Sequence, residues 1–191
     1  KKHNAYTATG EQKDYMIAVL LFAAFIENVS LFSQFLVIMS FNKHKNLFNG
    51  MSNVIEATSK EENLHYLFGV DLVNTIKEEH PEWFDEEMIN SFKTIAQEAY
   101  DSEMELLDWI FEDGELDFLS KHTVNHFLMN RFNDAFVSIG LDPIFEVDEQ
   151  EVIKTDWFQE EVVTTKHVDF FHKRNVNYTK RSKPITADDL F

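Results

Sequence analysis

The chain has no cysteine among its 191 residues. This absence excludes disulfides, thiolate metal sites and a cysteine nucleophile within the chain. Glycine and proline are scarce, with five and three residues, and so few positions interrupt the backbone. Such a composition favours long helices over many short strands. The chain also lacks a glycine-rich phosphate loop and a nucleophile elbow, and so no motif indicates a nucleotide site or a hydrolase triad.

Basic residues are outnumbered by acidic ones, 17 to 34, which gives a formal net charge of −17. A nucleic-acid partner would need a basic face, and we therefore expect no nucleic-acid binding. The acidic excess is explained by a solvated surface. The hydrophobic share of 44%, with 19 phenylalanines, is enough for the core of one folded domain.

The chain begins with Lys1 and has neither an initiator methionine nor the apolar core of a signal peptide. We therefore expect a middle piece of a longer protein, or one part of a divided one. Residues 16–41 form an apolar run long enough to suggest a transmembrane helix. Glu27, Asn28 and Gln34 lie inside this run, and their polarity favours a buried core helix and no membrane span.

Helical periodicity and end signals predict an all-α fold. Ser52 is the expected N-cap of the second predicted helix (residues 52–79), and His80-Pro81 ends this helix. The periodicity fades from residue 146, and residues 173–191 are expected to form a flexible tail after a helical domain over residues 1–172. The predicted helices cover residues 11–41, 52–79, 85–111 and 120–139.

Glu27 is the only formally charged side chain in the apolar run of residues 16–41. A lone buried carboxylate is costly, so it must be neutral, paired or bound to a metal. Glu62 and His65 on the next predicted helix are three residues apart, which places both on one helical face. One inward Glu and a Glu-x-x-His on the following helix form half of a ferritin-like dimetal carboxylate site. The other half of such a site has no counterpart in the chain.

This spacing leaves three interpretations open: a metal site, a buried and hydrogen-bonded Glu27, or a surface Glu–His pair. His122 and His126, four residues apart, are a weaker metal candidate, since no carboxylate is near them in sequence. Acidic residues also recur along the third predicted helix, where we expect a solvated face formed by Glu98, Asp101, Glu103, Glu105 and Asp108.

Several segments extend the pattern beyond the Glu-x-x-His motif. In chain order they are ENVSLFSQF from Glu27, SKEENLHYLFG from Ser59, WFDEE from Trp83, VNHFLMNRFNDAFVSIGLDPIF from Val124 and DWFQEEV…DFFHKRNVNY from Asp156. With these segments the chain resembles the small, radical-generating subunit of class I ribonucleotide reductase. The resemblance covers nearly the whole chain. It implies the C-terminal portion of a ferritin-like helical bundle that lacks the N-terminal helices.

The resemblance assigns a role to each candidate ligand. Glu27 matches a terminal ligand of one metal ion, His65 the imidazole of the same ion, and Glu62 a carboxylate that bridges both ions. Glu61 matches an acid just before the bridging residue, where the family usually has Asp. The implied cofactor is a dinuclear metal centre, with iron as the first expectation and manganese or a mixed manganese–iron pair as alternatives.

The C-terminal segment also has counterparts in the family. Tyr178 matches a tyrosine that relays a radical between subunits. The last four residues match a peptide that docks on the large subunit: Asp188, Asp189, Leu190 and Phe191. The resemblance implies a cytoplasmic ribonucleoside-diphosphate reductase that works with the large subunit, as a dimer of small subunits.

In that family, earlier helices supply an Asp, a second Glu-x-x-His, the radical-bearing Tyr and a relay Trp, none of which is matched here. We therefore expect a further partner, the N-terminal half of the small subunit, on a separate chain or segment. Two other hypotheses remain: a ferritin-like dimetal oxidase or oxygenase without a radical partner, and a metal-free fragment that only docks on the large subunit.

Overall fold

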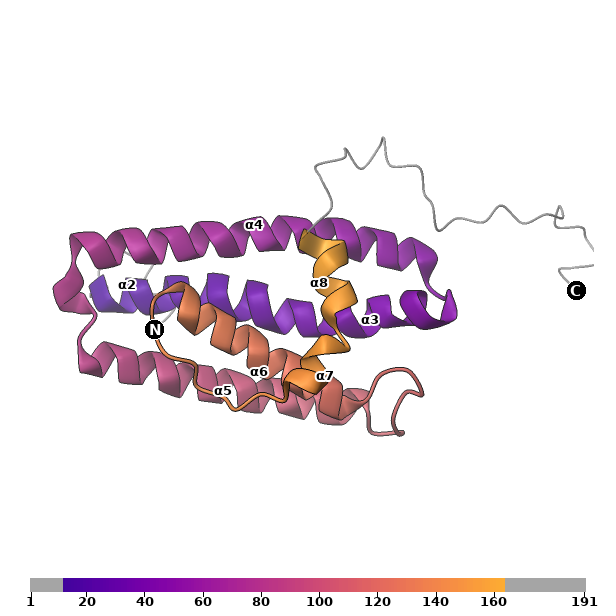
Figure 1. Cartoon of the computed structure of the whole chain (residues 1–191). Coiled ribbons are helices and arrows are strands. Elements are labelled where there is room, and N and C mark those ends of the chain that lie inside the picture. Colours follow the sequence, from indigo (N-terminus) through magenta and orange to yellow (C-terminus); the bar gives the residue numbers. More distant parts are fainter. Residues whose placement is uncertain (1–11, 164–191) are drawn as a thin grey trace, which may run out of the picture.

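The computed structural model describes residues 12–163, which begin with one long helical run. The run is composed of α2 (Gln12–Val19), the π-helix η1 (Leu20–Ser30) and α3 (Leu31–Lys45) (Figure 1). A helix was expected here, but its central π-helical section was not, and it ends at Lys45 instead of near residue 41. π-Helical turns are wider than α-helical ones and are often found at functional sites.

A short turn connects α3 to α4 (Asn49–Glu79), which runs back alongside it (Figure 1). Asn46 and Phe48 both adopt the left-handed conformation, with φ of 55° and 54°, and the chain reverses within three residues. The prediction of Ser52 as the N-cap is wrong. Ser52 lies in the first turn of α4 and donates its backbone N–H to the Phe48 carbonyl at 2.8 Å.

The other predicted helix ends are confirmed to within a few residues. Helix α4 ends at Glu79, before the short 3-10 helix η2 (Pro81–Trp83). Asp85 caps α5 (Glu86–Ile110), and Ser120 caps α6 (Lys121–Ser138), each through a side-chain oxygen that accepts a backbone N–H. Polar caps of this kind satisfy amides that the first helical turn leaves without partners.

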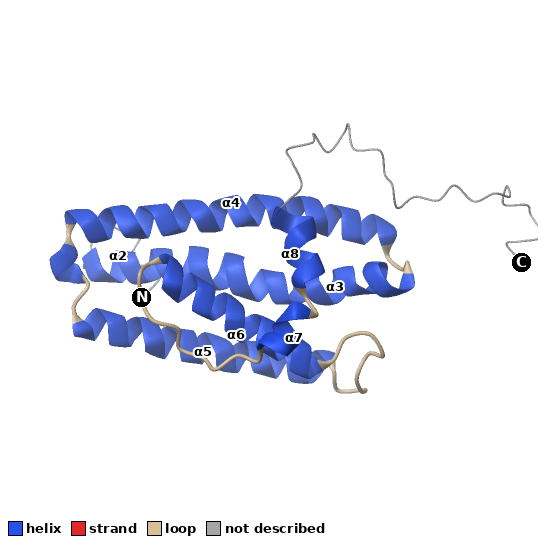
Figure 2. Ribbon diagram, in the orientation of Figure 1, coloured by secondary structure: helices blue, strands red, loops and turns tan. Residues whose placement is uncertain are grey.

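The core is formed where α5 and α6 pack against the long first run, on the side away from α4 (Figure 1). Aromatic side chains fill it: Phe25 of η1 lies edge-on to Phe132 of α6, with ring centroids 5.3 Å apart. Both rings are fully buried. Residues 12–163 form no β-strand, and the predicted all-α fold is confirmed for this part of the chain (Figure 2).

Two short helices follow where the sequence periodicity faded. Helices α7 (Glu149–Ile153) and α8 (Asp156–Val163) cross the bundle, and α8 reaches α4 (Figure 1). Phe158 anchors α8, since its buried ring lies edge-on to Phe32 of α3. Helices of five and eight residues are too short to give a clear periodic signal. The predicted tail, including Tyr178, lies outside the described residues.

Among the residues described, one helical run, Asp14–Lys45, is long and apolar enough to cross a membrane. Length and composition alone are weak evidence for a span, because the core helix of a globular bundle meets the same criteria. Here Phe25, Phe32 and Leu36 from this run are buried in the bundle. This packing agrees with the predicted core helix.

Candidate metal centre

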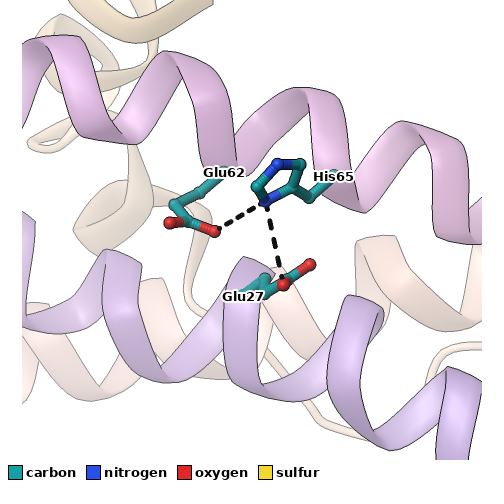
Figure 3. Close-up of side chains that lie close together, drawn as sticks. All are labelled: Glu27, Glu62 and His65. Carbon is teal, nitrogen blue, oxygen red and sulfur yellow. Dashed lines mark hydrogen bonds and ion pairs between the residues drawn. The ribbon is translucent and has the colours of Figure 1, made fainter.

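Three side chains meet between η1 and α4: Glu27 from η1, and Glu62 and His65 from α4 (Figure 3). Their nearest donor atoms all lie within 4.8 Å of one another. His65 Nδ1 is 3.2 Å from Glu62 Oε2 and 3.8 Å from Glu27 Oε1. The structure therefore brings together the three residues that the sequence singled out.

A close approach of the two helices places these side chains within reach of each other. Gly69 lies four residues after His65 on α4, and Ala23 lies four residues before Glu27 on η1. A Cβ atom added to Gly69 would overlap the Cβ of Ala23. Only a residue without a side chain permits this backbone separation. The two helices thus approach closely about one turn from the ligand cluster.

The charges in the cluster favour a positively charged occupant. Burial raises the pKa of Glu27, the His65 imidazole opposes this increase, and the neighbouring Glu62 carboxylate adds to it. The Glu62 carboxylate thus disfavours the ionised state of Glu27. A cation between them would remove that penalty. The His65 side chain is 58% exposed, and the cluster is therefore open on one side.

The donor set fits one side of an iron or manganese centre. Carboxylate oxygens suit hard divalent ions, and a neutral imidazole nitrogen suits iron. His65 offers Nδ1 to both carboxylates, so this nitrogen is directed into the cluster. Three protein ligands can hold one ion, but the dimetal carboxylate proteins use about twice as many for two. Among the described residues, the group at this position consists of these three ligands.

The remaining predicted site residues are not in this cluster. Glu61 is exposed on α4, next to Glu62 in sequence but about 100° away around the helix. Tyr178 and the last four residues lie outside the described part of the chain.

An apolar surface, here called the α4 face, lies on the outer side of α4. Val54, Leu64, Leu67 and Phe68 form it, with between 51% and 69% of each side chain exposed. Leu64 immediately precedes His65 in sequence. Large contiguous apolar patches are typical of interaction sites in folded proteins.

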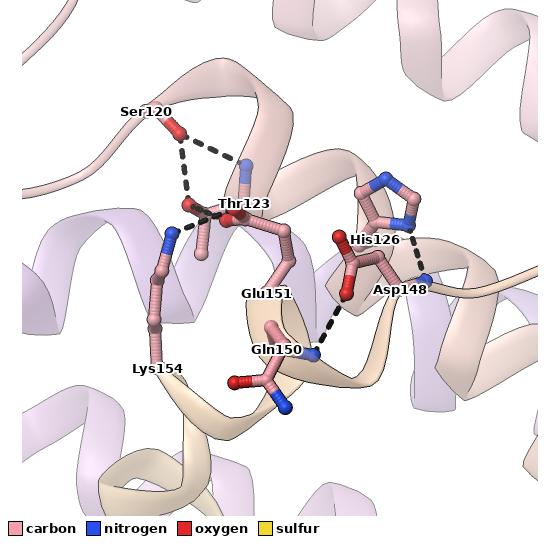
Figure 4. A network of polar contacts seen from close by, with 7 residues as sticks. All are labelled: Ser120, Thr123, His126, Asp148, Gln150, Glu151 and Lys154. Carbon is pink, nitrogen blue, oxygen red and sulfur yellow. Dashed lines mark hydrogen bonds and ion pairs between the residues drawn. The ribbon is translucent and has the colours of Figure 1, made fainter.

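A second group of possible ligands lies where α6 and α7 meet, and includes His122, Asp148 and Glu151. Figure 4 shows the two carboxylates of this group, Asp148 and Glu151, with their hydrogen-bond partners. No carboxylate lies near His122 in the sequence, but the fold brings Asp148 and Glu151 close to it. Asp148 caps α7 by accepting the Gln150 backbone N–H at 2.9 Å. Glu151 accepts hydrogen bonds from Thr123 and Lys154 at 2.7 and 2.6 Å. The Glu151 carboxylate therefore joins α7 to α6 through Thr123, whereas the Asp148 carboxylate caps α7 and only the Asp148 backbone N–H reaches α6, at His126 Nδ1, 3.1 Å away.

One member of the predicted solvated face is buried. Glu103 of α5 is 8% exposed and accepts a hydrogen bond from Ser33 Oγ of α3 at 3.3 Å. The other four acids of that face, Glu98, Asp101, Glu105 and Asp108, are exposed as predicted. Glu103 faces inward because helix α5 packs against the bundle along this line.

Comparison with known proteins identifies the family. The model of the family "Ribonucleotide reductase, small chain" matches residues 1–155. The chain is 24% identical over 177 residues to the probable ribonucleoside-diphosphate reductase small subunit 048L of Invertebrate iridescent virus 3, covering 92% of this chain and 46% of that protein. It is 26% identical over 153 residues to the ribonucleoside-diphosphate reductase subunit beta of Chlamydia pneumoniae, covering 80% and 42%.

A third relative is the ribonucleoside-diphosphate reductase subunit beta of Treponema pallidum, 22% identical over 184 residues, covering 94% of this chain and 51% of that protein. The chain thus spans about half the length of the curated relatives that it matches. Because the family model covers most of its residues, the chain belongs to the ribonucleotide reductase small-chain family and has that family's ferritin-like all-α fold.

Proposed function

We propose that this member of the ribonucleotide reductase small-chain family supplies half of a dimetal carboxylate site for a ribonucleoside-diphosphate reductase. One observation carries the proposal: Glu27, Glu62 and His65 place their donor atoms within 4.8 Å of one another across two helices. Deoxyribonucleotide synthesis by the assembled enzyme is the activity that the family supports best. In this proposal the chain acts as the C-terminal half of the small subunit.

Each ligand has a distinct role in the proposed site. Glu27 from η1 and His65 from α4 would hold one ion from opposite helices, and Glu62 would be the ligand shared with a second ion. A metal pair held there supplies the chemistry that reduces dioxygen and generates the enzyme's oxidant, with iron proposed before manganese or a mixed pair. The raised pKa of Glu27 means that metal binding at this residue competes with a proton.

The ligands missing from the site are proposed to come from the rest of the small-subunit fold, on this polypeptide or on another. Two observations support this step. The chain spans between 42% and 51% of the length of its curated relatives. The exposed α4 face borders the cluster, and apolar burial at about 25 cal/mol per Å² would favour covering it.

The large subunit is proposed as the second partner, and a dimer of small subunits as the working assembly. Tyr178 would relay the oxidising equivalent to the large subunit, with Glu61 beside the metal site. Residues 188–191 would dock on the large subunit. These assignments rest on the resemblance of the sequence segments. The names of the relatives, "small subunit" and "subunit beta", refer to multi-subunit enzymes.

Two ligand variants test the proposal in the complete small subunit that contains this chain. We expect Glu62→Ala and His65→Ala each to lower the metal content and abolish reduction of ribonucleotides with the large subunit. Asp71→Asn removes an exposed carboxylate from the same helix and serves as the control. Full metal content and normal reduction in both ligand variants would contradict the proposal.

Electron paramagnetic resonance separates the alternatives. A radical signal that depends on Glu62 and His65 supports the reductase. Metal that remains active toward dioxygen, with no effect of the large subunit, would indicate a ferritin-like oxidase or oxygenase. An assembly that binds the large subunit but no metal would indicate a docking fragment.

A further inference from the structure

Arg131 of α6 is a buried cation at the centre of the bundle. It is 4% exposed, and its guanidinium lies 3.9 Å from the ring centroid of Phe32 and 5.5 Å from that of Phe127. Burial lowers its pKa to about 10, and so it stays protonated at neutral pH. Burial of a charge is costly unless good hydrogen bonds compensate it. The partners of Arg131 therefore indicate what this charge does.

Both identified hydrogen bonds from the guanidinium go to one residue of η1, Asn28. Nε donates to the Asn28 backbone carbonyl, and Nη2 donates to the Asn28 side-chain oxygen. This two-pronged contact uses the planar fork that distinguishes arginine from lysine. Asn28 directly follows Glu27, 103 residues before Arg131 in sequence. The contact therefore fixes the backbone next to the candidate ligand.

The far end of α6 contacts the other ligand helix. Tyr66 Oη donates to Ser138 Oγ at 3.1 Å, and Asn74 Nδ2 donates to the Ser138 carbonyl at 3.0 Å. Tyr66 directly follows His65 on α4. Helix α6 is thus bonded to the residue after Glu27 at one point and to the residue after His65 at another.

We propose that Arg131 is a positioning residue for the Glu27 carboxylate, and that α6 acts as the brace between the two ligand helices. This inference rests on the proposed function, because it takes Glu27 and His65 as ligands. Glu27 lies on a π-helix, a rare backbone form that occurs mostly as single turns inside α-helices. The two buried hydrogen bonds from Arg131 to Asn28 restrict the backbone next to Glu27, and with it the direction of the Glu27 carboxylate. Metal affinity depends on such supporting contacts.

Two substitutions and one control test this inference. Arg131→Met removes the charge and keeps a long apolar side chain, and Arg131→Lys keeps the charge but loses the fork. Lys43→Met is the control, since Lys43 Nζ also lies over an aromatic ring, 5.1 Å from the Trp157 centroid, and pairs with Glu161 of α8 at 3.3 Å. Binding of Mn²⁺ is measured in the complete small subunit, and amide hydrogen exchange of η1 is measured in the metal-free protein.

We expect both Arg131 variants to bind Mn²⁺ about 10- to 100-fold more weakly, as for other residues that orient metal ligands. We also expect faster amide exchange in η1, with Lys43→Met within about twofold of wild type in affinity. Unchanged Mn²⁺ affinity in a folded Arg131 variant would overturn the inference, as would unfolding of both variants, because Arg131 would then serve the fold alone. A wild-type subunit that binds no Mn²⁺ would instead contradict the proposed function.

Discussion

Gly69 of α4 packs directly against Ala23 of η1, so that a Cβ on Gly69 would overlap the Ala23 Cβ and lie 3.6 Å from its Cα. This contact is about one helical turn from the cluster of Glu27, Glu62 and His65. The separation of the two ligand helices is therefore limited by the smallest side chains available. Any added atom at this point must move η1 and α4 apart.

The first prediction concerns this contact. Alanine in a helix interior is normally more favourable than glycine. Gly69→Ala should nevertheless destabilise the protein by about 1–3 kcal/mol, the usual cost of overpacking. Gly50 of α4 is the matched control, since nothing lies within 4 Å of an added Cβ there. Gly50→Ala should be neutral or slightly stabilising.

Urea unfolding of the three proteins measures these differences. The clash predicts a lower urea midpoint than wild type for Gly69→Ala and not for Gly50→Ala. A Gly69→Ala variant as stable as Gly50→Ala would mean that the two helices separate without cost at this point.

The second prediction concerns the pH dependence of the capping network in Figure 4. Hydrogen bonds from Lys154 and then Thr123 lower the pKa of Glu151 below its ordinary value of 4.5. A carboxyl with a lowered pKa in the folded state stabilises the fold above pH 4.5, and this contribution is lost as the pH falls through the lowered pKa. Glu151→Gln should therefore reduce the melting temperature at pH 7.

The difference from wild type should begin to shrink as the pH falls below 4.5 and should disappear once the pH is below the lowered pKa of Glu151. Glu149→Gln, on the same first turn of α7, provides the comparison for loss of a carboxylate near the helix N-terminus. Melting curves from pH 7 down to about pH 2, where such carboxyls are protonated, give the answer. An equal effect of Glu151→Gln at both ends of this pH range would show that the charge of Glu151 contributes nothing.

The third prediction concerns the exposed α4 face. Leu64 and Phe68 are 51% and 69% exposed, and the proposed function buries them against the rest of the small-subunit fold. Leu64→Gln and Phe68→Gln together should reduce self-association of the isolated chain and weaken its assembly into the complete subunit. The stability of the isolated chain should change little, because the two side chains make few core contacts.

Trp109→Gln on α5 is the control, since Trp109 is 65% exposed on a different helix. Sedimentation velocity at several concentrations measures the association. If Trp109→Gln disrupts assembly and the α4 variants do not, the covering segment binds elsewhere.

The helices of this fold could be predicted because their signals are local. Asp85, Ser120 and the His80-Pro81 pair mark helix ends within a few residues. Ser52 misled the prediction because the true start of α4 depends on Asn46 and Phe48, whose left-handed backbones have no clear sequence signal. The π-helical section was missed for a similar reason, since its composition does not differ from that of a buried α-helix.

Part of the site was also accessible from the sequence. Glu62 and His65 are three residues apart on one helix, and Glu27 stood out as the only charge in an apolar run. Arg131 was not accessible, because its partner Asn28 is 103 residues away and no local pattern connects them. The burial of Glu103 against Ser33, 70 residues apart, was missed for the same reason. Contacts between distant helices arise only when the bundle is assembled.

Titration of ferrous or manganous ion, first into this chain alone and then into the complete small subunit, tests the central claim most directly. Calorimetry gives the number of ions and their affinities in both cases. The three ligands Glu27, Glu62 and His65 predict weak binding by the chain alone. They predict two tight sites once the missing ligands are present. Two tight sites on the isolated chain, or no metal in the complete subunit, would contradict the account.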